Sequence, residues 1–198
     1  MAKVVKFPGP APEKFGLQRV GKKKGKDSEK HGQLPLFSGG RVVKFNQLSS
    51  FENALVQDDN NNMKSAKELY QKAIQEGDSL ADAWCNLGII ESKEDNSTKA
   101  IDCFTQSLKA DPRHYEAHYN LANLYAEVGN YGLAKFHYGI SIEVEPTFPN
   151  SYFNLGLTLA MNKEFVEAVK LLHAYRGLSS GEDHAYTDEL IRQLTIVP

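Results

Sequence analysis

The sequence predicts an all-α chain in which short helices fold back on one another in pairs and the pairs stack into an array. Between residues 84 and 112, apolar and small side chains recur at spacings of three and four, in two runs separated by a polar segment at 92–97. This is the pattern of two amphipathic helices. The pattern returns 34 residues away in both directions, and a period of that length is typical of repeat arrays.

Residues 1–46 predict a basic, low-complexity arm ahead of the array. Residues 1–50 carry 11 Lys and Arg against 3 acids, whereas residues 51–198 carry 12 against 22 acids. The stretch 21–32 has no bulky apolar side chain and cannot bury enough surface to offset the entropy of ordering. We therefore expect the arm to be largely disordered or extended, and its charge favours association with the acidic array.

Two features of the arm allow more than one interpretation. The run Val-Val-Lys-Phe occurs at 4–7 and again at 42–45, each time after a basic residue. It is either a chance repeat or an extended motif that docks in a groove. The lysine cluster at 22–26 is either a solvated linker or a contact for nucleic acid or an acidic protein.

The 34-residue period is clearest in the second helix of each pair. Alanines recur at this spacing, each followed four residues later by a bulky side chain: Ala66 and Tyr70, Ala100 and Phe104, Ala134 and Tyr138, Ala168 and Leu172. The first helices carry a small residue in register at Gly88, Ala122 and Gly156, and Pro112 and Pro146 mark the turns between units. At these positions the chain resembles the tetratricopeptide repeat (TPR) family, whose unit is a 34-residue helix–turn–helix.

The resemblance implies a right-handed superhelix (α-solenoid) of four TPR helix pairs. The four units are expected at 47–80, 81–114, 115–148 and 149–182. The second unit matches the family pattern most fully, and the first matches least, with Asn53 and Asp78 at two pattern positions. A bulky side chain at one of the repeated alanines is expected to cost about 1–3 kcal/mol through overpacking.

The end of the array is expected to carry a cap, because each unit covers only its neighbour. A loop is predicted at 177–181. The segment 183–198 then has an apolar stripe at helical spacing, formed by Tyr186, Leu190, Ile191 and Leu194. We interpret it as a C-terminal capping helix and tail.

The family resemblance also implies that the first helices line a concave, peptide-binding groove. The residues that it places there are Phe51, Leu55, Asp82, Asn86, Ile89, Glu116, Tyr119, Asn120, Asn123, Phe153, Asn154 and Leu157. Three of the asparagines, Asn86, Asn120 and Asn154, repeat at 34. An amide that both donates and accepts can pair with the main chain of an extended peptide, or it can bond a neighbouring helix instead.

The charges of this predicted groove favour one kind of ligand. Asp82 and Glu116 are acidic, and no basic residue stands where a carboxylate-binding clamp would need one. A basic, partly apolar peptide fits better, and the arm's own Lys-Val-Val-Lys-Phe has that composition. We expect this motif to dock intramolecularly and to compete with an outside partner.

No arrangement of residues predicts catalysis. His114 and His118 are four residues apart on one expected helix but lack a third ligand, and Cys85 and Cys103 form no metal-binding motif. The sequence therefore predicts no catalytic residue, no cofactor and no metal.

The function predicted from sequence is a non-enzymatic scaffold that binds a protein or peptide. One alternative is a regulatory protein whose basic arm contacts nucleic acid while the array binds a partner, and another is assembly with further copies of itself. With two cysteines and no apolar run long enough to span a membrane, the chain is expected to be cytoplasmic and not membrane-bound.

Overall fold

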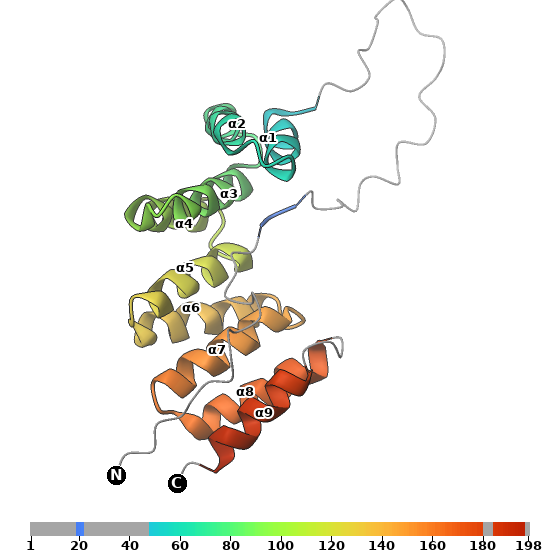
Figure 1. Cartoon of the computed structure of the whole chain (residues 1–198). Helices are drawn as coiled ribbons and strands as arrows, with labels where there is room; N and C mark the ends of the chain where they lie inside the picture. The colour runs from blue at the N-terminus through green and yellow to red at the C-terminus, as the bar shows by residue number, and fades with distance from the viewer. Residues whose placement is uncertain (1–18, 22–47, 180–183, 197–198) are drawn as a thin grey trace, which may run out of the picture.

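The computed structural model describes residues 19–21, 48–179 and 184–196, and in these ranges it contains α-helices and no strand. The helices are α1 (Ser50–Asp59), α2 (Met63–Glu76), α3 (Leu80–Lys93), α4 (Ser97–Ala110), α5 (Tyr115–Glu127), α6 (Tyr131–Val144), α7 (Pro149–Met161), α8 (Phe165–Leu178) and α9 (His184–Thr195). They stack in successive antiparallel pairs, with α9 lying against α8 at the end (Figure 1). The predicted solenoid of four helix pairs and a capping helix is confirmed.

Small residues in the first helix of a pair receive bulky side chains from the second. A Cβ added at Gly88 would lie 2.8 Å from Cε1 of Phe104, and one added at Gly156 would lie 3.0 Å from Cγ of Leu172. The alanines at 66, 100, 134 and 168 are all fully buried. The side chains that repeat at 34 residues are therefore those that hold each pair together.

The turn inside each pair places one residue in the left-handed region of backbone conformation. These residues are Asn61, Asp95, Gly129 and Lys163, with φ between 56° and 75°, and they again stand 34 apart. Glycine adopts this conformation without strain and Asn or Asp at small cost, but lysine does not. The last turn thus carries a strain that the other three largely avoid.

The array starts and finishes with different local structures. At the N-terminal end, Ser49 and Glu52 form a reciprocal capping box that starts α1. At the other end, α8 continues to Leu178, so the loop predicted from residue 177 is wrong at its first positions. A glycine costs only about 1 kcal/mol inside a helix, which the last turn of α8 tolerates at Gly177.

Helix α9 acts as the expected cap. Its Leu190 and Leu194 are buried in one apolar cluster with Leu172 and Tyr175 of α8. Helix α9 thus covers the side of the last unit that no further unit covers. Among the helices that the structure describes, none combines the length and apolar character needed to cross a membrane.

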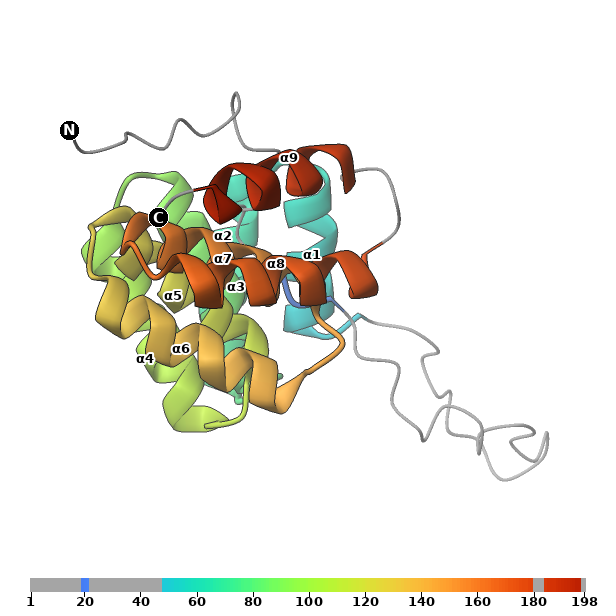
Figure 2. The ribbon, with the colours of Figure 1, turned by 90° about the horizontal axis from the view of Figure 1, so that it is seen from below.

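Residues 19–21 are the described part of the N-terminal arm, and they pack against helices that come much later in the sequence. Figures 1 and 2 show this short segment beside α1 and α3. The two Val-Val-Lys-Phe runs and the lysine cluster at 22–26 lie outside the described residues. The docking expected of the Lys-Val-Val-Lys-Phe motif therefore stays a prediction.

Candidate functional site

The side-chain amide of Asn86, in α3, pairs with the main chain of Val20. The Val20 N–H donates to Oδ1 of Asn86 at 2.9 Å, and Nδ2 of Asn86 donates to the Val20 carbonyl at 2.9 Å. Both ends of the amide are used, so its orientation is determined by its partners. This contact joins residues 66 positions apart in sequence.

Two further side chains connect Asn86 to Arg19. The same Nδ2 of Asn86 donates to the Tyr70 hydroxyl at 3.2 Å, and that hydroxyl donates to Oδ2 of Asp58 at 3.3 Å. Oδ1 of Asp58 lies 2.7 Å from Nη2 of Arg19. Asp58, Tyr70 and Asn86 come from α1, α2 and α3, so the packing of three successive helices builds the site.

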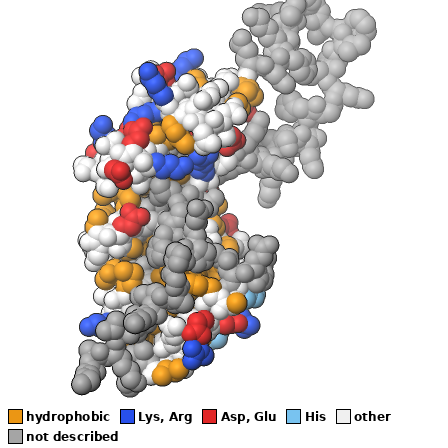
Figure 3. Space-filling view, in the orientation of Figure 1, with side chains coloured by type: hydrophobic (Ala, Val, Ile, Leu, Met, Phe, Trp, Pro, Cys, Tyr) orange, Lys and Arg blue, Asp and Glu red, His pale blue; other side chains and the backbone are white. Residues whose placement is uncertain are grey.

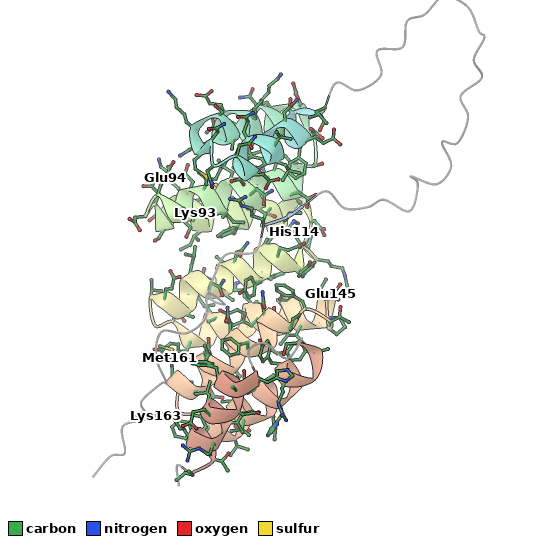
Figure 4. All side chains as sticks on the ribbon, turned by 45° about the vertical axis from the view of Figure 1, so that its right-hand side comes forward. Lys93, Glu94, His114, Glu145, Met161 and Lys163 are labelled. Atoms are coloured by element: carbon green, nitrogen blue, oxygen red, sulfur yellow. The ribbon has the colours of Figure 1, made fainter. Side chains whose placement is uncertain are left out.

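The electrostatics of the site depend on Asp58, whose side chain is 1% exposed. Burial raises the pKa of this carboxyl, and the positive charges of Arg19 and Lys93 oppose that shift. Burial lowers the pKa of the Lys93 ammonium, which projects from the end of α3 (Figure 4), and the charge of Arg19 adds to the effect. Burial and Asp58 raise the pKa of Tyr70, which keeps its hydroxyl protonated as a donor.

The side chain of Val20 is enclosed by the array. Val20 is 1% exposed and belongs to a buried apolar cluster with Cys85, Ile89, Ala117 and Leu121, among others. These residues come from α3 and α5. A short piece of the arm therefore completes part of the hydrophobic core where α3 and α5 meet.

The C-terminal half of the array contains a second, buried asparagine network. Nδ2 of Asn154 donates to the Tyr119 hydroxyl at 2.9 Å and to Oδ1 of Asn123 at 3.0 Å. The Tyr138 hydroxyl also donates to Oδ1 of Asn123. Burial raises the pKa of Tyr119 to about 12, although its bonds to Asn123 and Asn154 oppose the shift. These bonds connect α5, α6 and α7.

Between the two networks, polar contacts join α3 to α5. Nδ2 of Asn120 donates to Sγ of Cys85 at 3.5 Å. Nε2 of His114 lies 2.9 Å from Oδ1 of Asp82, and Nδ1 of His114 accepts the Ala117 N–H at 3.1 Å. Asp82, which lies on the first helix of its pair, therefore also helps to hold α3 against the start of α5 through His114.

The structure places the twelve residues predicted for the groove on α1, α3, α5 and α7. Asn86 and Ile89 are brought together with Val20. Phe51 packs its ring against Tyr70 at a centroid distance of 5.9 Å, and Leu157 is buried in the core of the last two units. Residues of both kinds, facing the arm and filling the core, therefore occur in the predicted set.

Sequence reasoning missed Arg19 and Val20 as a docked pair and assigned Tyr70 only to helix packing. A signal for Asp58 was present, because the repeat places Ser92 and Ala126 at the equivalent positions. A buried acid at one unit alone is a departure from the period that needs a partner.

Charged side chains gather over α1–α4 on the face seen in Figure 3, and hydrophobic ones are exposed over α5–α7. Within the described ranges, no group of three or more His, Cys, Asp or Glu side chains is placed to hold a metal ion. Of the two histidines considered from sequence, His114 faces Asp82, and Nδ1 of His118 lies 2.9 Å from Nδ1 of His137.

Comparisons with known proteins agree with this architecture. Profiles of the tetratricopeptide repeat family match residues 81–114, 103–136 and 137–170. Human protein O-mannosyl-transferase TMTC3 is 37% identical over 108 residues, which is 52% of this chain and 12% of that protein. The BBSome complex member BBS4 homolog of Drosophila melanogaster is 24% identical over 131 residues, 66% of this chain and 27% of that protein. The chain thus spans well under half of these relatives.

Solved structures share the fold at low sequence identity. MamA superposes with a TM-score of 0.63 at 16% identity, over 74% of this chain and 80% of its own. YrrB, described as a TPR protein with an unusual peptide-binding site, gives 0.60 at 20% identity, over 74% and 79%. The first TPR of Spaghetti (RPAP3), bound to the HSP90 peptide SRMEEVD, gives 0.54 at 19% identity, over 58% and 90%. These similarities show the fold.

Proposed function

The chain belongs to the tetratricopeptide repeat family, and we propose that it is a non-enzymatic interaction protein whose concave groove binds an extended peptide segment of a partner. The observation that carries this proposal is the pairing of Asn86 with both main-chain groups of Val20. Main-chain pairing needs no particular ligand side chain, so the same amide can hold another chain that reaches the groove.

The charges of the groove support a basic, partly apolar ligand. Asp58, Asp82 and Glu116 are acidic and buried or partly buried on the first helices. A peptide such as the SRMEEVD bound by the Spaghetti repeat would bring carboxylates toward these carboxylates. A ligand with Arg or Lys beside an aliphatic side chain would instead be complementary to them.

We further propose that the arm is autoinhibitory. Because Arg19 and Val20 occupy the N-terminal end of the groove, a partner that uses this part must displace them. The arm is on the same chain, so its docking is intramolecular and competes at a high effective concentration. The partner then binds more tightly when the arm is removed.

A pull-down comparing three proteins tests the proposal: the full chain, residues 41–198, and residues 41–198 with Asn86→Ala. We expect the shortened chain to retain more of a partner than the full chain, and the Asn86→Ala form to lose that gain. Crosslinking followed by mass spectrometry should place a basic segment of the partner next to α3. Equal capture by all three proteins would contradict the groove, and equal capture by the first two would contradict autoinhibition.

A further inference from the structure

We propose that the N-terminal end of the groove recognises a specific dipeptide, an arginine followed directly by a small branched aliphatic residue, in the partner's peptide. The inference rests on the proposed function, and it specifies what the ligand must contain. The segment Arg19–Val20 is the instance of this dipeptide that the structure shows. Three features of the site select this dipeptide, one each for the arginine, the main chain and the aliphatic side chain.

The arginine position is selected by two neighbouring carboxylates. Nη2 of Arg19 lies 2.7 Å from buried Asp58, and Nη1 lies 3.5 Å from exposed Asp59. A planar guanidinium can address both acids at once, whereas a lysine ammonium is a single point charge. The buried carboxylate also has a strong need for a cation, because an unpaired buried charge is costly.

The main chain is held in register with that arginine. The Arg19 guanidinium forms an ion pair with Asp58, and hydrogen bonds continue from Asp58 through Tyr70 and Asn86 back to the N–H and C=O of Val20. The series closes on itself within one dipeptide. A ligand in which the arginine and the paired peptide group are not adjacent cannot satisfy both ends.

The size of the next side chain is restricted by the cluster around Val20. Because Val20 is 1% exposed among packed side chains, an aromatic residue there would overpack the cluster and alanine would leave it underfilled. The following position is different. A Cβ added at Gly21 would meet nothing within 4 Å, so the site does not select glycine there.

The other units lack this combination of side chains. At the position of Asp58 they have Ser92 and Ala126, and Phe104 replaces Tyr70 in the second unit. Although Asn120 and Asn154 keep the amide, no carboxylate stands at the equivalent place to attract an arginine. The arginine is therefore recognised at one place along the array, and this fixes the position of the ligand relative to the helices.

The occupant that fits is a partner segment with this chemistry. The same dipeptide on a second copy of the chain would fit equally, and the experiment must separate the two. The test uses the full chain with Arg19→Ser and Val20→Asp, which frees the groove, and a fluorescent peptide that copies residues 14–24. Binding is followed by fluorescence anisotropy at constant salt, and circular dichroism verifies that the double variant is folded.

Peptide variants give the expected order of effects. Replacing the arginine by alanine, or exchanging the order of arginine and valine, should weaken binding about tenfold or more. Arginine to lysine and valine to phenylalanine should each weaken it severalfold, and glycine to alanine at the third position should change it less than about twofold. In the protein, Asp58→Asn should abolish the preference for arginine over alanine, whereas the exposed Asp102→Asn should not.

A second form keeps the groove sequence unchanged in case the double variant does not fold. A protease site is introduced within residues 22–47 of the full chain and cut, and unlabelled peptides then compete with the cleaved arm. Equal binding of all peptides would overturn the dipeptide rule but leave the groove's function intact. Failure of every peptide to bind would overturn both.

A measurement of self-association tests whether the occupant is instead a second copy of the chain. Analytical ultracentrifugation of the wild-type full chain is expected to show a monomer at the concentrations of the binding test. A dimer that Arg19→Ser with Val20→Asp converts to monomer would mean that the dipeptide binds a second copy. That result would overturn the assignment to a partner.

Discussion

Asn86 and Asn154 occupy the same place in their repeats, 68 residues apart, but they have different partners. Asn86 pairs with the main chain of a distant segment, whereas Asn154 bonds Tyr119 and Asn123 of the preceding unit. The difference comes from their neighbours, because Tyr70 connects Asn86 to an acid and Tyr138 reaches Asn123 instead. A repeat therefore determines where a side chain stands, and the residues that depart from the repeat determine what it contacts.

The largest effect is expected when the Asn154 network is broken. Asn154→Ala removes two buried hydrogen bonds that connect units three and four, and buried polar groups that lose partners cost about 2–3 kcal/mol in total. We expect the melting temperature to fall by roughly 5–10 °C. Asn150→Ala, on the same helix and partly exposed, is the matched control. Equal shifts for the two variants would show that the network adds little.

A smaller effect on stability, but a larger one on the arm, is expected for Asn86→Ala. The variant loses the two bonds to Val20 and the bond to Tyr70. Because the arm can leave without unfolding the helices, we expect a loss of about 1–2 kcal/mol. Tryptic cleavage of the Arg19–Val20 bond, followed by mass spectrometry, should become much faster than in the wild type. Gly21→Ala should leave this cleavage unchanged.

The sequence accounts for the array and its packing better than for the site. The alanines and glycines at 34-residue spacing predicted the contacts inside each pair, because that packing is local and repeated. The asparagines were expected either to pair with an extended main chain or to bond a neighbouring helix; Asn86 makes the first kind of contact, with Val20, and Asn154 makes the second. That Arg19 and Val20 would be the segment was not predicted, since a contact between residues 66 apart leaves no trace in a local pattern.

The second and third helix pairs are also expected to respond differently to acid, because α3 and α4 contain no histidine whereas the third pair places His118 of α5 against the partly buried His137 of α6. Burial and His118 lower the pKa of His137 to about 4, from an ordinary value of 6.5. Nε2 of His118 is 3.2 Å from the Pro112 carbonyl, so Nδ1 of His118 accepts a hydrogen bond from His137. Tyr125 stacks on the His137 ring and adds to its burial.

The direction of the pH effect follows from that shift. Between pH 6.5 and about 4 the unfolded chain protonates His137 and the folded chain does not, so stability falls as the pH is lowered through this range. After allowance for solvent screening, we expect the loss from this residue to be about 1 kcal/mol. It is measured as the difference between wild type and His137→Phe in urea unfolding at pH 7 and pH 4.5. The exposed His173→Gln should show no such difference from wild type.

The smallest effect concerns the turns, where the same place in the repeat carries Gly129 in one unit and Lys163 in the next, with φ of 75° and 65°. Lysine is strained in this conformation and glycine is not, but glycine also has more freedom to lose on folding. We expect Lys163→Gly to stabilise the chain by about 0.5 kcal/mol and Gly129→Ala to destabilise it by about 1 kcal/mol. Urea midpoints at unchanged m-value measure both, and a destabilising Lys163→Gly would mean that the lysine side chain has a compensating contact in that turn.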